Sequence, residues 1–404
     1  MDVITILKKH ILLALFYFFL TALLGVILRF FPITNLDVTY KFIVHTHSHI
    51  ALLGWVYTAL TTLIYTLFLN KNKKHYLRIF WLTQFSIIGM LCSFPFQGYA
   101  LFSIFFSTLF LFASYLFLNF FLKNTSPIIK QRYSYKLIKV SLWFMVLSSI
   151  GPWVLGGIMS TLGNTSIWYK IAIYFYLHFQ YNGWFILALF GIFFYILEEK
   201  KILPKKQDTT AFYWLMIPSI LLTFFLSVLW TKPHAIFYIL AGIGSVLQIL
   251  AIGKFIQILQ KNNLAKITDS KTKFLLKTAF AFLLIKIILQ TSTLLPYFAN
   301  LPSQILHFVI GYIHLIFLGI ISISLFALLH HFKLIKLSKG GYTLFLIGFL
   351  ITEVLIFYKG FSIWLLLYIP ENYLLLLAIF SIFMGIGILW IFLKNVQSFL
   401  NTKQ

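Results

Sequence analysis

Long apolar runs alternate with short polar connections along the whole chain of 404 residues. A membrane-spanning helix needs roughly 20 consecutive apolar residues, because the hydrocarbon core of a bilayer is about 30 Å thick. Twelve runs of this kind occur, with no room between them for a soluble domain. The pattern predicts an all-α membrane protein, a single polytopic domain over residues 1–404. The runs are His10–Phe31, Phe42–Leu69, Ile79–Phe96, Tyr99–Phe121, Leu137–Met159, Trp168–Leu197, Phe212–Trp230, Ala235–Leu259, Phe274–Leu295, Ile305–Leu329, Tyr342–Tyr358 and Tyr373–Leu393.

Composition agrees with a membrane protein, since 61% of the residues are hydrophobic and only 10% are charged, far from the balance of a soluble domain. Lys8 and Lys9 precede the first run as in a signal peptide, but the run is too long and no small-residue cleavage site follows. We expect a retained helix. The single Cys92 excludes a disulfide framework and a multi-cysteine metal site.

The net charge of +24 gathers in the connections that follow even-numbered helices. Because cytoplasmic loops carry the excess of lysine and arginine, this distribution predicts that both termini are cytoplasmic. Anionic membrane lipid is the expected partner of this charge. Nucleic acid is not, because the charge forms no aromatic-lined surface. The clusters are Lys71, Lys73, Lys74 and Arg78; Lys123, Lys130 and Arg132; Lys200, Lys201, Lys205 and Lys206; Lys261, Lys266 and Lys271; and Lys333, Lys336 and Lys339.

Histidines inside apolar helices are candidate ligands, because an imidazole away from water needs a partner. A carbonyl of the backbone is the ordinary partner of a single buried histidine. Here several histidines fall at a similar depth, in the outer halves of the second, sixth and tenth helices, which favours a metal site. Histidines at the boundaries, such as His10 and His75, are expected to be satisfied by water. The candidates are His45, His47, His49, His178, His307 and His314.

The stretch "VHTHSHIALLGW" places His45 and His49 on one helical face at the four-residue spacing, and His47 on nearly the opposite side. One face therefore offers two candidate ligands, while His47 would support them or lie at the lipid interface. With cysteine and carboxylates nearly absent from the helices, imidazole ligands favour haem iron, copper or zinc over calcium or magnesium.

Two glycines are candidates for the wall of a haem site. Gly54 and Gly319 each lie five residues after a histidine, His49 and His314, and a glycine lets a flat macrocycle approach the backbone. This spacing favours His49 as the ligand of the second helix, although the context of His45 keeps it as an alternative. Packing between helices would require small residues equally well.

These features resemble subunit I of the haem/copper oxidase superfamily, above all the large subunit of nitric oxide reductase and the C-family cytochrome oxidases. The segment "HFVIGYIHLIFLG", residues 307–319, is similar to the family pattern H-x-x-x-x-H-x-H-L-x-x-x-G, and "HFQYNGWF", residues 178–185, is similar to H-x-x-x-E-G-x-W. The segment "GIGSVLQIL" after Pro233 is also similar to its counterpart. The resemblance implies an oxidase-like bundle in which His314 and a histidine of the second helix ligate one low-spin haem.

The chain departs from the family at its catalytic metal centre. Tyr312 stands where the family has the iron ligand of its catalytic haem, and Asn182 stands where the reductases have glutamate. His178 matches one copper ligand, but residues 212–230 contain no histidine for the adjacent pair. We expect Tyr312 to be packed with its hydroxyl bonded to a neighbour, although His307 or His178 could replace the missing ligand. The cofactor expected is one low-spin haem, taken to be of b type, without copper.

Glu353 is the only acid in the middle of a predicted helix, and intramembrane carboxylates are costly enough to indicate function. It could relay protons, together with Tyr312 and Asn182, or it could pair with Lys286 or a neighbouring hydroxyl. Lys254 and Lys286 are expected to extend toward the cytoplasmic boundary.

The residues and the resemblance together predict one-electron transfer in a respiratory membrane, in the inner membrane of a bacterium, with a cytochrome c subunit or quinol as electron donor. Two alternatives stay open. One is an active oxygen or nitric oxide reductase, an oxidoreductase with an unconventional second site. The other is a haem or metal transporter or a gas sensor, in which the outer histidines pass a ligand inward.

Overall fold

The computed structural model describes residues 3–69, 72–202, 204–262 and 267–401. Every regular element of these ranges is a helix, and twelve helical spans are long and apolar enough to cross a membrane, which confirms the predicted runs. Two residues of the charge clusters, Lys71 and Lys266, lie outside the described ranges. The spans are Thr5–Phe30, Tyr40–Leu69, Lys73–Gln97, Leu101–Asn124, Tyr133–Thr161, Ile167–Glu199, Lys206–Thr231, Ala235–Lys261, Ser270–Ser292, Leu306–His331, Lys339–Leu365 and Tyr373–Asn401.

Most spans extend beyond the apolar run that predicts them. The eleventh span, for example, runs from Lys339 to Leu365, several residues past each end of the run 342–358. A helix pairs its own backbone N–H and C=O groups, as a lipid environment requires, and nothing in a short polar flank forces that pairing to stop. Apolar runs thus locate each span, whereas helix ends depend on caps and turns.

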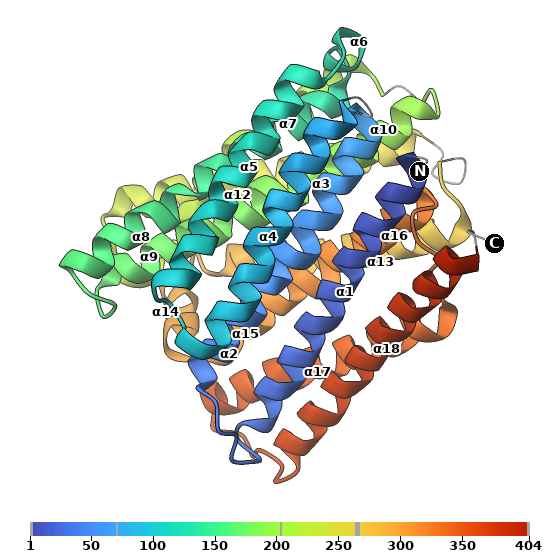
Figure 1. Ribbon diagram of the computed structural model, residues 1–404. Coiled ribbons are helices and arrows are strands. Elements are labelled where there is room, and N and C mark those ends of the chain that lie inside the picture. The colour runs from blue at the N-terminus through green and yellow to red at the C-terminus, as the bar shows by residue number, and fades with distance from the viewer. Residues whose placement is uncertain (1–2, 70–71, 203, 263–266, 402–404) are drawn as a thin grey trace. The chain divides into compact units, whose positions relative to one another are not determined.

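The chain divides into two compact units, and the first comprises Met1–Asn124 and Leu325–Gln404. Within it α17 packs along α18, α18 along α1, and α4 along α5, as Figure 1 shows. Short π-helical segments interrupt the second span. The elements are α1 (Val3–Phe30), α2 (Tyr40–His49), the π-helix η1 (Ile50–Tyr57), α3 (Thr58–Ile64), the π-helix η2 (Tyr65–Leu69), α4 (Lys73–Gln97), α5 (Leu101–Asn124), α16 (Ile323–His331, from Leu325), α17 (Lys339–Leu365) and α18 (Tyr373–Asn401).

The second unit comprises Thr125–Ser324. Here α11 packs along α12, α10 and η3 along α7, and α13 along η6. The elements are α6 (Pro127–Lys130), α7 (Tyr133–Ser148), α8 (Ile150–Thr161), α9 (Ile167–His178), the π-helix η3 (Phe179–Ile186), α10 (Leu187–Glu199), α11 (Lys206–Thr223), the 3₁₀-helix η4 (Phe224–Thr231), α12 (Ala235–Lys261), α13 (Ser270–Ser292), α14 (Pro296–Gln304), α15 (Leu306–His314) and the π-helix η6 (Leu315–Ser322).

Carboxylates at the end of α10 hold the start of α7 in the second unit. Glu198 accepts hydrogen bonds from the backbone N–H of Ser134 at 3.0 Å and from its hydroxyl at 2.5 Å. Arg132 donates to Glu199 at 2.6 Å, and this bond raises the pKa of the Arg132 guanidinium above its ordinary value. The contact satisfies backbone donors that the first turn of a helix leaves unpaired.

The close approach of α1 and η1 yields a stability prediction at Gly54. A Cβ atom there would lie 2.8 Å from the Cβ of Tyr17, a rigid atom close to the backbone that cannot rotate away. Gly54→Ala should therefore lower the free energy of unfolding by about 1–3 kcal/mol, measured by denaturant or thermal unfolding in detergent. Gly156→Ala is the matched control, because nothing lies within 4 Å of its added atom. Equal stability of the two variants would contradict the packing argument.

Candidate functional site

Three spans share one local arrangement around a candidate histidine. His49, His178 and His314 are each followed directly by a π-helical segment of eight residues, η1, η3 and η6. The second, sixth and tenth spans, which carry these segments, have the largest buried shares of the twelve. A π segment widens the helix by one residue per turn, and such segments occur frequently at functional sites.

Each of the three segments also carries a glycine five residues after its histidine, in "HIALLG", "HFQYNG" and "HLIFLG". A Cβ on Gly54 would meet Tyr17 of α1, and one on Gly183 would meet Phe144 of α7 at 2.6 Å. In both cases an aromatic side chain of the preceding span fills the space that glycine leaves open. Close packing of α1 against η1 is thus enough to require a glycine at position 54, and no haem is needed to explain it. The sequence analysis noted the motif at Gly54 and Gly319 and missed the copy at Gly183.

The histidines of the second span face two directions, as the helical spacing predicts. The rings of His45 and His49 both lie against Tyr99, with ring centroids 4.6 and 5.8 Å away. His47 turns toward α1, where its Nδ1 lies 3.0 Å from the carbonyl oxygen of Thr21. His47 is thus held by a neighbouring helix of the same unit, on the side away from Tyr99.

His49 has the hydrogen-bonding geometry of a ligating histidine. Its Nδ1 lies 2.8 Å from the carbonyl oxygen of His45, and because a carbonyl only accepts, Nδ1 must carry the proton. The lone pair then lies on Nε2, which faces the hydroxyl of Tyr99 at 3.3 Å. Metal-binding histidines commonly donate the other ring N–H to a carbonyl in this way.

His178, like His49, has a protein partner at each ring nitrogen, but its lone pair faces a side-chain amide instead of a hydroxyl. Nε2 lies 2.8 Å from the carbonyl oxygen of Ile220 in α11, so Nε2 donates. Nδ1 then accepts from the side-chain amide of Asn182 at 3.3 Å. In this arrangement the only lone pair of the ring is used by an amide N–H, and no nitrogen is left for a metal.

A chain of hydrogen bonds continues from His178 through Asn182 to the ninth span. Lys286 Nζ donates to Asn182 Oδ1 at 2.6 Å and also to Gln290 Oε1, which in turn accepts from the Tyr312 hydroxyl at 3.3 Å. We call His178, Asn182, Lys286, Gln290 and Tyr312 the Lys286 network. It combines α9, η3, α13 and α15, all within the second unit.

The network settles two expectations about single residues. The hydroxyl of Tyr312 is bonded to a neighbour, as predicted. The expectation that Lys286 extends to the membrane boundary is wrong, since its side chain is fully buried and two amide oxygens hold its ammonium inside. Lys254 does stay partly exposed, with Nζ 3.0 Å from Gln257 Oε1. His307 lies half-buried near the start of α15, seven residues before His314.

Glu353 lies on α17 in the first unit and is 8% exposed. Neither carboxyl oxygen has a hydrogen-bond partner among the described residues, and Lys286 donates to amides instead. Pairing with Lys286 or with a neighbouring hydroxyl is therefore not found. Its electrostatic partner is Arg29 at the end of α1, which the sequence analysis did not single out.

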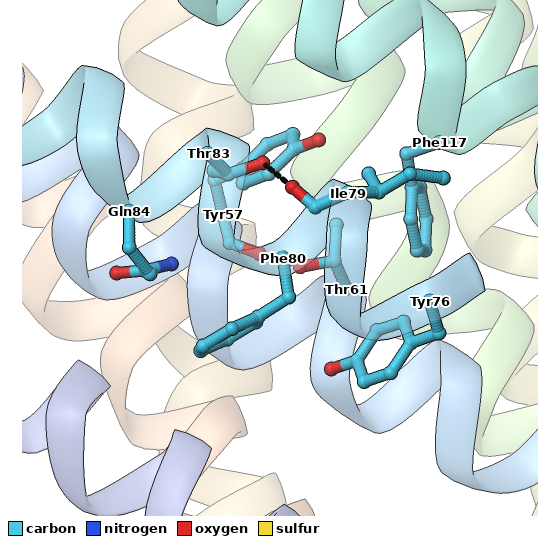
Figure 2. A pocket seen from close by; sticks show the side chains of 8 residues that line it. All are labelled: Tyr57, Thr61, Tyr76, Ile79, Phe80, Thr83, Gln84 and Phe117. Carbon is cyan, nitrogen blue, oxygen red and sulfur yellow. Dashed lines mark hydrogen bonds between the residues drawn. The ribbon is translucent and has the colours of Figure 1, made fainter. Parts of the chain in front are cut away.

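A small enclosed space lies between the second, third and fourth spans of the first unit (Figure 2). Its volume is about 10 Å³, room for one water molecule at most. Gln84 lines it, and the side-chain oxygen of Gln84 is buried without a hydrogen-bond partner. Tyr76 lines it too and bonds Nδ1 of His10 at 3.1 Å. His10 is 4% exposed, so the expectation that water satisfies this histidine is wrong.

No group of three or more histidine, cysteine or carboxylate side chains that could hold a metal ion occurs within the described ranges. An axially ligated haem iron needs only two protein ligands, so it requires no such group. What the side chains form instead is a pair of imidazoles in the second span, His47 and His49, whose Nδ1 atoms are bonded to backbone carbonyls, and a polar network around Lys286.

The unequal bonds of the Lys286 network predict unequal costs of breaking it. Asn182→Leu removes an acceptor from a buried ammonium and a donor from His178, and should destabilise the protein by about 3 kcal/mol. Tyr312→Phe removes one neutral bond and should cost about 1 kcal/mol or less. Thermal unfolding of the purified variants in detergent measures both. Equal losses would show that Asn182 does not hold the ammonium.

No protein-family model matches the chain, and no curated protein matches it. Its function must therefore be inferred from its own residues and their contacts.

Proposed function

We propose that the chain is a membrane haem protein of the haem/copper oxidase subunit I type, which transfers single electrons through one low-spin haem. The axial ligands are His314 and a histidine of the second span, as the sequence resemblance implies, and the glycine spacing favours His49 over His45 for the latter. The termini lie in the cytoplasm and the membrane is the inner membrane of a bacterium. The observation that carries the proposal is the geometry of His49, whose Nδ1–H is bonded to its own helix and whose Nε2 faces the hydroxyl of Tyr99, a group that can rotate.

The residues present fit a haem ligand at His49 better than at His45. The carbonyl of His45 fixes the tautomer and rotation of the His49 ring. The ring of His45 itself meets Tyr99 edge-on. The Tyr99 hydroxyl is 3.3 Å from Nε2, a long bond that ligation would replace at small cost. A bound haem would supply one-electron chemistry, with its potential tuned by the ligand and its surroundings.

The residues that match the family's second metal centre do not fit a metal in this chain. His178, Asn182 and Tyr312 all belong to the Lys286 network, so the positions matching a copper ligand, a glutamate and an iron ligand are joined by protein hydrogen bonds. The fully buried ammonium of Lys286 would repel a metal cation at this place. This supports an electron carrier over a reductase.

The first prediction of this proposal concerns ligation. His314→Ala should abolish the sharp reduced spectrum of a low-spin haem, and His49→Ala should do the same, because an iron that loses an axial imidazole changes spin state or leaves the protein. Visible spectra and haem content of the purified variants measure this. His75→Ala is the control, since this ring is exposed and stacks on Phe120. A wild-type spectrum in the His314 variant would show that the assignment is wrong.

A further prediction separates the carrier from a reductase. A haem with two histidine ligands has no vacant coordination position, so the reduced protein should form no stoichiometric carbon monoxide complex. After washing with a chelator the purified protein should hold less than one copper per chain, because His178 has no free nitrogen. Carbon monoxide difference spectra and metal analysis check both points. One tightly held copper per chain, or two haems of which one binds carbon monoxide, would support the reductase.

A further inference from the structure

In its ammonium form Lys286 has no counter-charge among the described members of its network. The Lys286 side chain is 0% exposed, and its two acceptors, Asn182 and Gln290, are neutral amides. The other members, His178 and Tyr312, bring no negative charge. Among the described residues, salt bridges of lysine involve only Lys254 and Lys261. A buried ion without a counter-charge is strongly unfavourable in a low-dielectric interior.

The buried groups left unsatisfied in the network are hydrogen-bond donors. An ammonium has three N–H donors, and two of those on Lys286 are used. The amide nitrogen of Gln290 has no hydrogen-bond partner, although this residue is only 7% exposed. Because Gln290 Oε1 already accepts from Lys286 and Tyr312, rotating the amide would exchange one unsatisfied group for others. A ligand that paired with these free N–H groups would therefore have to be a hydrogen-bond acceptor.

We propose that the Lys286 network is a binding site for one small monovalent anion, held by Lys286 Nζ and Gln290 Nε2. Negative charge offsets the ammonium, and one acceptor atom satisfies both donors at once. Complete burial restricts the ligand to about one to three heavy atoms, such as chloride or nitrite. The anion would be held by Lys286 and Gln290 of α13, neither of which is a proposed haem ligand.

The test measures thermal unfolding of the full-length protein in detergent, in sodium gluconate, with gluconate replaced stepwise by sodium chloride or sodium nitrite at constant ionic strength. Gluconate serves as the reference because it is too large for the site. The wild type should show a saturable rise in Tm, since a ligand that binds only the folded state stabilises it. Lys286→Met should lose this rise, or need at least about tenfold more anion for half the effect.

Gln290→Glu gives a second variant that keeps the acceptor and the length of the side chain. Its carboxylate would supply the counter-charge from within, so its Tm in gluconate should exceed that of the wild type and should not respond to chloride or nitrite. Lys277→Met is the matched control, because Lys277 lies exposed on the same helix, and it should respond as the wild type does. The variant pair keeps the test decisive if one of them fails to fold.

A wild type without a saturable response to either anion would overturn the proposal. So would a Gln290→Glu variant that responds like the wild type, since the site would then not involve Gln290. These outcomes are read from Tm and leave the haem spectra untouched, so a failure here is distinguishable from a failure of the proposed electron carrier.

Discussion

The hydrocarbon core of a membrane contains no water, so each polar group inside a spanning helix must find its partner within the protein. This constraint decides where the unusual residues of the chain lie. The three spans with the largest buried shares carry the candidate histidines and their π segments. Lys286 remains fully buried because Asn182 and Gln290 accept from its ammonium.

Features that depend on local periodicity could be predicted from the sequence. Apolar runs located all twelve spans because hydropathy and helix length are properties of contiguous residues. The four-residue spacing of His45 and His49 placed them on one face, and the helical repeat turned His47 away from it. The helix ends were predicted less well, since polar flanks neither require nor forbid another turn.

Features that depend on partners from other helices could not be predicted. A lysine near the middle of a span reaches the boundary by default, and only the amide oxygens of Asn182 and Gln290 hold Lys286 inside. The spacing of Lys286 and Gln290, four residues apart on α13, was a local sign of a shared polar face. The electrostatic influence of Arg29 on Glu353 has no such sign, because α1 and α17 are far apart in sequence. The third histidine–glycine motif, at His178, was visible in the sequence and went unnoticed.

Two copies of that histidine–glycine motif, at His49 and His178, have the same backbone structure but different hydrogen bonds at the histidine ring. At His49 the proton lies on Nδ1, donated to a carbonyl of the same helix, and the lone pair of the opposite nitrogen faces the hydroxyl of Tyr99. At His178 the proton lies on Nε2, donated to a neighbouring helix, and an amide uses the remaining lone pair. Both histidines precede a π segment and a glycine that receives an aromatic ring. The motif therefore sets how closely the helices pack, whereas the second partner of each imidazole decides whether it can hold iron.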